Sequence, residues 1–524
     1  METIATFLDR AAALRPERPA LIHGATRISF GDLANRVDGL AANFQSRGLP
    51  PLARVAVYRE KSIDMVVAAL AAMKAGLIAV PINPKLKLAQ VLHIVSDCEP
   101  SLFFTTAHRA GTVGPQLPPA TALLTDAVAN DEASSLDRVL RSIVDADPAI
   151  IFYTSGSTGQ PKGVVASHRN LVAGATSVNA YLGTHSDDVI MAVLPLSFDA
   201  GFSQITTGLH AGCCVVLHEY LRPLELIKLC AEHRVTSMTA IPPLWVQLAE
   251  AAWPTEAAES LRLFANTGGH MPTPLLQKLR SLFPRATPFL MYGLTEAFRS
   301  TYLDPREVDI RPNSIGKAIP NAEVLVLRED GSECAPNEPG ELVHRGAHVC
   351  LGYWRDACRT AEKFRPRSVF EGAFPQPTVW SGDIVTRDEE GFLYFVSRRD
   401  EMIKTSGYRV SPSEIEQAIL GLDGISEAVV FGVPDPTLGQ RIVGVVRQSE
   451  LVEADLAAHL RRVLPAYMVP EIVAIGALPR NPNGKLDRPR IKADYVGGLV
   501  ADYVDGLVAE TTEPLPRIAA GGRA

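Results

Sequence analysis

Short apolar runs alternate with amphipathic helical patterns from the amino terminus to about residue 320. The apolar run RVAVYRE (54–60), for example, precedes a helical pattern, SIDMVVAALAAMKAG (62–76), which precedes a second apolar run, LIAVPINP (77–84). A strand, a helix and a strand in this order form a βαβ unit, in which the two strands lie parallel. We therefore expect an α/β fold, with functional residues in loops that follow the carboxyl ends of strands.

The length and punctuation of the chain predict three regions. At 524 residues the chain is longer than one hydrophobic core usually serves. Glycines and prolines between 311 and 395 separate short apolar runs, which is typical of antiparallel β structure. We expect a large N-terminal domain over 1–399, with βαβ subdomains and a β-rich subdomain, and a small α+β domain over 400–492, whose first helix is signalled by the capping residue Ser411. Residues 493–524 are expected to form a tail, which begins with the tandem duplication ADYVGGLV and ADYVDGLV.

Composition narrows the function classes. With 58 acidic and 51 basic residues the net charge is −7, which argues against a broad nucleic-acid-binding surface. The seven cysteines include no CxxC pair and are expected to be thiols, not a disulfide framework or a zinc site. The amino terminus lacks a signal-peptide pattern, and the most apolar stretch, 65–84, is too interrupted to span a bilayer. We therefore expect a cytoplasmic protein with no membrane partner.

The segment TSGSTGQPKG (154–163) directly follows the strand-like run AIIFY. Its glycines and hydroxyl residues can surround a polyphosphate with backbone N–H groups and side-chain hydroxyls, and a lysine adds positive charge. It lacks the spacing of a Walker loop, and the alternative interpretation is a flexible Ser/Gly surface turn. The candidate phosphate-binding residues are Thr154, Ser155, Gly156, Ser157, Thr158, Gly159 and Lys162.

Further motifs follow this loop in a fixed order. Together with KAGLIAVPINP and TSGSTGQPKG, the segments YGLTE, GELVHRG, GYW, WSGD, SRRDEMIKTSGYRVSPSEIE and NPNGKLDR resemble the adenylate-forming (AMP-binding) superfamily. This superfamily comprises acyl-CoA synthetases, nonribosomal peptide synthetase adenylation domains and luciferases, and the resemblance covers residues from about 10 to 490. It implies a large N-terminal domain and a small mobile C-terminal lid. It also implies an ATP-dependent ligase that activates a carboxylic acid as its acyl-AMP and passes the acyl group to a thiol.

The resemblance assigns the residues that would promote adenylation. Attack of a carboxylate on the α-phosphate builds negative charge, which cations and fixed donors stabilise. Lys485 matches the lid lysine that bridges the substrate carboxylate and the α-phosphate, although a lysine in such a turn can also be merely solvated. Glu296 matches the glutamate that binds Mg²⁺, which accepts a single carboxylate as its protein ligand. Thr295 would contact the α-phosphate, and Tyr292 would border the adenine.

Two residues match the ribose-binding positions and two match the lid. Asp383 and Arg398 lie where family members bind the ribose. Asp400 matches the hinge about which the lid rotates, and Lys404 matches a lysine that serves thioester formation. The sequence departs mildly from the family pattern at Trp380, Ser381 and Ser397.

The segment LPLSFDAGF (194–202) bears on the acid that is activated. Phe198 and Asp199 resemble the FDxS motif of amino-acid-activating domains, whose aspartate pairs with the substrate ammonium group, although Gly201 replaces the serine. The alternative is that Asp199 only caps a helix beginning at residue 200. Arg299 could bind a substrate carboxylate, pair with Asp199, or face water. The remaining positions that match the acid-binding pocket of the family are Ala240, Ala265, Thr267, Met291 and Ser300.

Three functions remain open at this point. The leading prediction is activation of an amino acid or an amino-bearing acid, followed by transfer to the phosphopantetheine thiol of a separate carrier protein. It rests on the FDxS-like segment, and the chain is expected to be a stand-alone ligase because no condensation or carrier domain is recognised in it. The first alternative is a ligase that forms a coenzyme A thioester of an acid without nitrogen. The second is a non-catalytic nucleotide-binding paralogue, against which the presence of Lys485, Glu296 and Asp383 argues.

Overall fold

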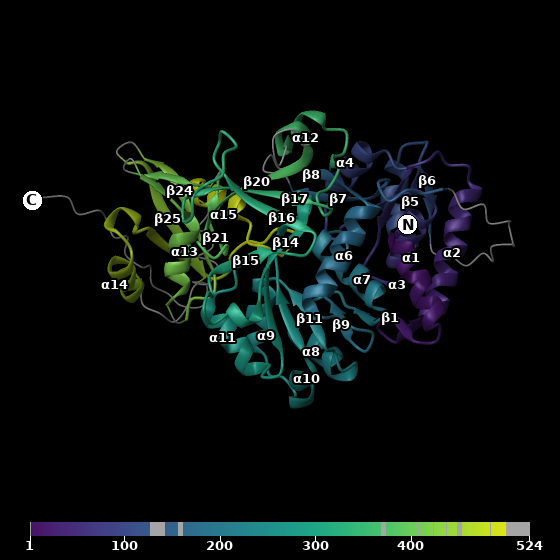
Figure 1. The fold of residues 1–524 in the computed structure, drawn as a ribbon, viewed down its shortest axis with the longest axis horizontal. Coiled ribbons are helices and arrows are strands. Elements are labelled where there is room, and N and C mark those ends of the chain that lie inside the picture. Colours follow the sequence, from purple (N-terminus) through teal and green to yellow (C-terminus); the bar gives the residue numbers. More distant parts are fainter. Residues whose placement is uncertain are drawn as a thin grey trace, which may run out of the picture. The chain divides into compact units, whose positions relative to one another are not determined.

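A computed structural model describes residues 2–125, 142–155, 161–367, 374–399, 401–405, 408–422, 424–435, 438–447, 453–482 and 484–498. The chain divides into two compact units, Met1–Phe395 and Val396–Ala524. Figure 1 shows the elements of both units along the chain. Each unit has its own sheets and its own hydrophobic core, and each is described by itself below.

The first unit contains a seven-stranded sheet in the order β18-β8-β7-β4-β3-β5-β6. Its strands are β18 (Gly352–Tyr353), β8 (Pro161–Ser167), β7 (Pro148–Ser155), β4 (Ile78–Ile82), β3 (Arg54–Tyr58), β5 (Leu102–Thr105) and β6 (Ala122–Leu124). The strands from β7 to β6 pair in parallel, as the βαβ pattern predicts. Strand β8 instead runs antiparallel to β7, so that the candidate phosphate loop lies within a hairpin.

A second, larger sheet contains fourteen strands of the described chain. Its central strands β13 (Thr287–Leu294), β12 (Leu263–Asn266), β11 (Ser237–Ala240), β9 (Val189–Ala192), β10 (Cys214–Leu217) and β1 (Pro19–His23) pair in parallel. Strand β2 (Thr26–Ser29) closes one edge in antiparallel orientation. Beyond β13 the order continues through β14 (Phe298–Leu303), β15 (Ser314–Ala318), β21 (Leu393–Arg398), β20 (Gln376–Arg387), β17 (Gly340–Gly346) and β16 (Ala322–Leu327), with β19 (Phe364–Arg367) on β20.

The antiparallel extension matches the β-rich subdomain expected from the glycine and proline pattern. It begins earlier than expected, at β14, because the chain reverses directly after the YGLTE motif. The alternation of strands and helices therefore ends near residue 294 instead of 320.

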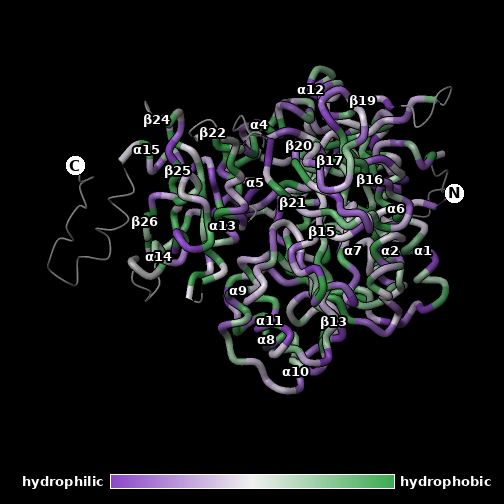
Figure 2. The backbone as a smooth tube through the Cα atoms, turned by 60° about the vertical axis from the view of Figure 1, so that its left-hand side comes forward, coloured by the Kyte–Doolittle hydropathy of each residue, from purple (hydrophilic) through white to green (hydrophobic). Residues whose placement is uncertain are grey.

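Helices connect the parallel strands. Those of the first unit are α1 (Ile4–Leu14), α2 (Phe30–Ser46), α3 (Ile63–Lys74), α4 (Leu88–Cys98), α5 (Ala107–Val113), α6 (His168–Leu182), α7 (Asp199–Ala211), α8 (Pro223–Glu232), α9 (Pro242–Glu250), α10 (Thr255–Ser260), α11 (Thr273–Leu282) and α12 (Ala357–Lys363). Figure 2 shows polar and apolar residues mixed along α2, whose buried positions recur every three or four residues. Helix α3 differs, because its buried residues surround the whole helix.

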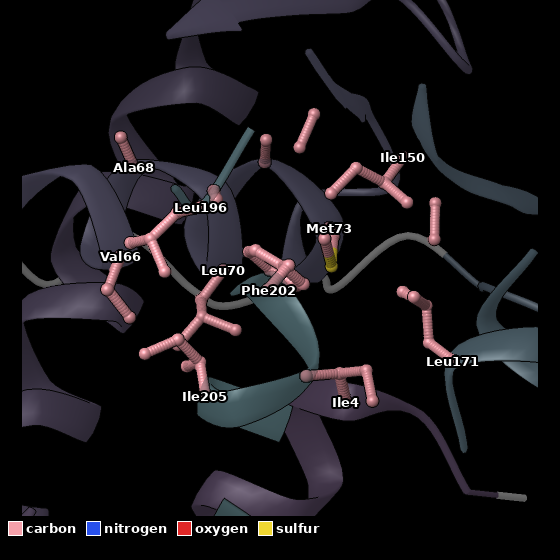
Figure 3. Close-up of a cluster of buried hydrophobic side chains, with 14 of the residues drawn as sticks. Ile4, Val66, Ala68, Leu70, Met73, Ile150, Leu171, Leu196, Phe202 and Ile205 are labelled. Carbon is pink, nitrogen blue, oxygen red and sulfur yellow. The ribbon is translucent and has the colours of Figure 1, made fainter. Parts of the chain in front are cut away.

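A single apolar core joins the two sheets through these helices. It contains side chains of α1, α2, α3, α6 and α7 together with residues of β3 and β7 from one sheet and of β1 and β10 from the other. Figure 3 shows Phe202 and Ile205 of α7 beside Leu70 of α3, and Leu171 of α6 and Ile4 of α1 belong to the same cluster. The core therefore fixes α7, the helix that begins with Asp199, between the two sheets.

The second unit has the small α+β architecture that the sequence predicts. Its strands are β22 (Ile403–Thr405), β23 (Tyr408–Val410), β24 (Ala428–Asp435), β25 (Gly439–Arg447) and β26 (Glu471–Ile475), and its helices are α13 (Pro412–Leu420), α14 (Glu453–Val463) and α15 (Arg488–Val496). Ser411 caps α13 by accepting a hydrogen bond from the Glu414 N–H, as expected. The tandem duplication begins within α15 and is described as far as Gly498, and residues 499–508 lie outside the described residues.

Two expectations about composition can be compared with the structure. All seven cysteines are free thiols. Within the described ranges, no helix has both the length and the apolar character needed to cross a bilayer.

Candidate active site

The candidate phosphate loop joins β7 to β8. Thr154 pairs with Lys162 in the hairpin, so both ends of the loop are held in register. Residues 156–160, which include Gly156, Ser157, Thr158 and Gly159, lie outside the described residues, and the side chain of Ser155 is not described either. A Cβ atom on Gly163 would lie 2.7 Å from Ile151 Cγ2, so a larger residue would force a shift where β8 pairs with β7.

Lys162, Glu296 and Tyr353 form one polar cluster. The Lys162 ammonium lies 3.1 Å from Glu296 Oε1 and donates a hydrogen bond of 2.8 Å to the Tyr353 hydroxyl, which donates one of 2.6 Å to Glu296 Oε1. The Lys162 Nζ atom also lies 4.3 Å from the centroid of the Tyr353 ring. The candidate phosphate-binding lysine and the candidate magnesium-binding glutamate are thus neighbours in the fold.

The charge state of Glu296 follows from this cluster. Its side chain is 9% exposed, and burial alone would raise the pKa of the carboxyl group. The charges of Lys162 and Lys363, together with the Tyr353 hydrogen bond, outweigh burial and lower the pKa below its usual value. Glu296 is therefore ionised at neutral pH and can bind a cation.

Tyr292 and Asp383 meet from separate strands of the large sheet. The Tyr292 hydroxyl of β13 donates a hydrogen bond to Asp383 Oδ2 of β20. The Tyr292 ring stacks on His344 of β17, with ring centroids 6.2 Å apart and an interplanar angle of 18°. Ser381 Oγ accepts a hydrogen bond from the Asp383 N–H and donates one to the Leu342 carbonyl. The serine that departs from the family pattern therefore helps to hold Asp383 in place.

Asp199 lies at the start of α7, and its side chain contacts the YGLTE motif. The Thr295 hydroxyl donates a hydrogen bond of 2.8 Å to Asp199 Oδ1. The helix begins at Asp199, and its cap residue is Phe198, which makes no side-chain capping bond. The alternative that Asp199 caps a helix beginning at residue 200 is therefore wrong. Two candidates separated by nearly a hundred residues, Asp199 and Thr295, come together.

Gly201 replaces the serine of the FDxS pattern for a steric reason. A Cβ atom at this position would lie 2.0 Å from the Pro195 carbonyl oxygen and 2.9 Å from the Leu194 carbonyl oxygen. The chain preceding α7 therefore folds back against residue 201 so closely that only glycine fits.

This contact predicts a stability effect. Gly201→Ala should lower the unfolding temperature, with a loss of about 1–3 kcal/mol, because the backbone must shift to admit the methyl group. Gly39→Ala is the matched control, since Gly39 also lies in a helix and a Cβ atom there meets nothing within 4 Å. The control should stabilise the protein by up to about 1 kcal/mol. Thermal unfolding of both variants measures the difference, and an unchanged Gly201→Ala variant would show that this turn is not rigid.

The remaining acid-binding candidates do not all lie on one face of the sheet. Ala265 pairs with Thr239 and Ala240 with Asn266, so Ala240 points to the face opposite Ala265. Ala265 and Met291 belong to one apolar cluster beside α6, whereas Ala240 belongs to another. Thr267 directly follows β12, and its N–H donates a hydrogen bond of 3.0 Å to the Ala240 carbonyl. The strand register therefore places Ala240 on the face opposite Ala265. It places Thr239, which the sequence pattern did not indicate, on the same face as Ala265.

Arg299 and Ser300 lie in β14, where a bulge interrupts its pairing with β13. Arg299 is 3% exposed and donates a hydrogen bond of 3.0 Å to the Ala200 carbonyl. Ser300 is fully buried. The interpretation that Arg299 faces water is therefore wrong.

The other candidates belong to the second unit. Lys485 is exposed on a turn in which Gly484 has a φ of 79°, and the Lys485 N–H donates a hydrogen bond of 3.1 Å to Asn481 Oδ1. Arg398 ends β21 and is half-buried. Asp400 lies outside the described residues, and the side chain of Lys404 is not described. Within the described parts of the chain, no group of three or more His, Cys, Asp or Glu residues could hold a metal ion.

Two residues in or beside this cluster, Tyr353 and Lys363, were not assigned a role from the sequence. Tyr353 was noted only as part of the GYW motif, and its hydroxyl bridges Lys162 and Glu296. Lys363, at the end of α12, donates to the Ser381 carbonyl and acts on Glu296 through its charge. The GYW motif was a signal for the tyrosine, but no pattern in the sequence singles out Lys363.

Comparison with known proteins identifies the family of the chain. The sequence matches the AMP-binding enzyme family over residues 8–354 and the AMP-binding enzyme C-terminal domain over residues 414–485. The chain belongs to the AMP-binding enzyme family. The predicted superfamily, fold class and enzyme class are thereby confirmed: the protein is an AMP-forming ligase that activates a carboxylic acid as its acyl-AMP.

Individual relatives represent both kinds of acyl acceptor. The L-proline–[L-prolyl-carrier protein] ligase of Streptomyces coelicolor is 33% identical, over 92% of this chain and 95% of the relative. Tyrocidine synthase 2 of Brevibacillus parabrevis is 29% identical over 93% of this chain, which spans only 13% of that relative. The O-succinylbenzoate coenzyme A synthetase of Bacillus subtilis, solved in complex with ATP and a magnesium ion, superimposes with a TM-score of 0.81. It is 26% identical, over 93% of this chain and 99% of that one.

Proposed function

We propose that this ligase activates an amino acid, or another acid bearing an amino group, and transfers it to the phosphopantetheine thiol of a separate carrier protein. The observation that carries the proposal is the contact between Asp199 and Thr295, one residue from Glu296. This contact supports the presence of the Asp199 carboxylate, a negative charge, beside the place where the acyl group would be activated. An acid without nitrogen would leave that charge near an apolar substrate, which is costly.

ATP and Mg²⁺ would be the cofactors, and all but one of the residues proposed to bind them, Arg398, belong to the first unit. Two observations support the binding of ATP and Mg²⁺ here. Glu296 is ionised and contacts the positively charged Lys162 ammonium, and the Thr154 hydroxyl is buried without a partner among the described residues. Glu296 would bind Mg²⁺, and Lys162 with the loop from Thr154 to Gly159 would bind phosphates. Thr295 would contact the α-phosphate. Tyr292 would border the adenine, and Asp383 with Arg398 would bind the ribose.

The second unit would act as the mobile lid over residues 400–492, with Asp400 as its hinge and 493–524 as a tail. Lys485 would reach the substrate carboxylate and the α-phosphate during adenylation. Its exposed position on a tight turn supports this role, because an exposed lysine is available to a substrate.

The acid would lie against the sheet face that carries Ala265 and Met291, and Thr267 would also contact it. The pairing of Thr239 with Ala265 supports Thr239 as a further contact in place of Ala240. Phe198, Arg299 and Ser300 would complete the surroundings of the acid. The carrier-protein acceptor of the proline-activating relative supports a carrier as partner, whereas the coenzyme A synthetase relative supports the alternative of coenzyme A.

A panel of acids tests the proposal. ATP–pyrophosphate exchange is measured with amino acids, their deamino analogues, fatty acids, aryl acids and dicarboxylates. We expect an amino-bearing acid to give the highest kcat/KM, at least about a hundredfold above its deamino analogue. Thioester formation is then compared with a carrier protein and with coenzyme A. A preference for an acid without nitrogen, together with rapid coenzyme A thioester formation, would replace the proposal with the acyl-CoA ligase.

A further inference from the structure

Arg299 is a buried charge with few protein partners. Its guanidinium donates a hydrogen bond to the Ala200 carbonyl and makes a second one with the Tyr181 hydroxyl, and its Nε has no partner among the described residues. No carboxylate of the described chain forms an ion pair with it, although Asp199 precedes Ala200 directly. The interpretation that Arg299 pairs with Asp199 therefore lacks support.

This arrangement is unfavourable for the free protein. A guanidinium stays protonated at any pH that a protein tolerates. A buried charge without an opposite charge is costly, and proteins retain one where a ligand supplies the partner. Arg299 is therefore a candidate for binding an anion.

The surroundings of Arg299 place it with the acid-binding candidates. Arg299 pairs with Gly293 in the hairpin of β13 and β14 and so shares the sheet face of Met291. The Tyr181 hydroxyl contacts Met291 Sδ at 2.9 Å, and the Tyr181 ring stacks on Tyr302 with centroids 4.3 Å apart. Burial raises the pKa of Tyr181 to about 12, and the charge of Arg299, together with its hydrogen bond to the Tyr181 hydroxyl, opposes that increase. A hydroxyl thus accompanies the guanidinium on this face.

We propose that Arg299 binds a second anionic group of the acid, so that the enzyme activates a substrate with two carboxylates. The location of the acid rests on the proposed function. Within that function the substrate is an acidic amino acid: Asp199 binds its ammonium group, and Arg299 binds the carboxylate that is not activated. The hydrogen bond from Arg299 to Ala200 positions both charged groups at the first turn of α7. A bidentate guanidinium also discriminates strongly against the uncharged amide.

Matched pairs of acids that differ only in this charge test the inference. The pairs are aspartate and asparagine, glutamate and glutamine, and, without nitrogen at the α-carbon, succinate and its half-amide. Wild type should prefer the dicarboxylate of the better pair by at least about a hundredfold in kcat/KM for pyrophosphate exchange. Arg299→Met should abolish this preference, whereas Arg299→Lys should retain part of it. Arg306→Met is the control, because Arg306 is an exposed arginine paired with Asp304, and it should change nothing.

The outcomes separate the two proposals. A wild type that prefers the amide of each pair overturns the role of Arg299, even if an amino acid remains the best substrate. A wild type that prefers succinate over both amino pairs supports Arg299 and overturns the amino-acid assignment. A preference that Arg299→Met retains in full also overturns the role of Arg299, and if Arg299→Met folds poorly, a full preference in Arg299→Lys overturns it in the same way. Calorimetric binding of the same pairs in the presence of a non-hydrolysable ATP analogue provides a readout that does not require turnover.

Discussion

Replacing Lys485 with alanine is expected to slow acyl-adenylate formation by about two to three orders of magnitude. The proposed lid lysine stabilises charge on the carboxylate and the α-phosphate, and this charge develops only in the first half-reaction. Transfer of the acyl group from pre-made acyl-AMP should remain near the wild-type rate. Pyrophosphate exchange measures the first half-reaction, and single-turnover thioester formation measures the second.

A lysine elsewhere in the second unit provides the control for this experiment. Lys492 lies in α15, outside every proposed contact with substrate, so Lys492→Ala should leave both half-reactions unchanged. Gly484 and Asn481 hold the Lys485 turn through backbone conformation and main-chain bonds, which the alanine variant retains. An equal loss in both half-reactions would contradict the assignment of Lys485 to one conformation of a moving lid.

The parallel part of the fold could be predicted because its strands carry a local signal. Each of β3, β4, β5, β7, β9, β10 and β11 is a short apolar run, and most of them are separated by helical patterns. Strand β8 was not predicted. It follows the glycine-rich loop directly and pairs with β7 as a hairpin, and the loop residues give no sign that a strand continues after them.

The site could be predicted as a set of motifs but not as a set of contacts. Lys162, Glu296 and Tyr353 lie far apart in the sequence. The pairing of β18 with β8 brings Tyr353 beside the strand of Lys162, and the Cys350 N–H donates a hydrogen bond to the Glu296 carbonyl, which holds Glu296 next to the segment that leads into β18. The separation of Ala240 from Ala265 has a similar cause. Adjacent residues of a strand point to opposite faces, so a shift of one position exchanges Ala240 for Thr239, and only the register with β12 decides between them.

Replacing Asp199 is expected to lower kcat/KM for an amino-bearing substrate by about a hundredfold or more. Removal of one partner from a partly desolvated ion pair costs about 2–5 kcal/mol, and about 1.4 kcal/mol corresponds to each factor of ten. Two replacements separate the charge from the hydrogen bond. Asp199→Asn removes the charge but keeps an oxygen that can accept from the Thr295 hydroxyl, whereas Asp199→Ala removes both. Both variants should have a lower kcat/KM for the amino substrate and a higher relative preference for its deamino analogue.

The contact with Thr295 makes the comparison of these two variants informative. If the charge of Asp199 binds the ammonium group, Asp199→Asn should lose as much activity as Asp199→Ala, while its affinity for ATP and its unfolding temperature stay close to wild type. If Asp199 only positions Thr295, Asp199→Asn should retain most of the activity, and Thr295→Val should reproduce the defect of Asp199→Ala. In that second case the amino-acid assignment loses its main support. Pyrophosphate exchange measures the preference between the amino substrate and its deamino analogue for all three variants. This preference decides between the two roles, because a purely positional defect lowers kcat/KM for both substrates alike.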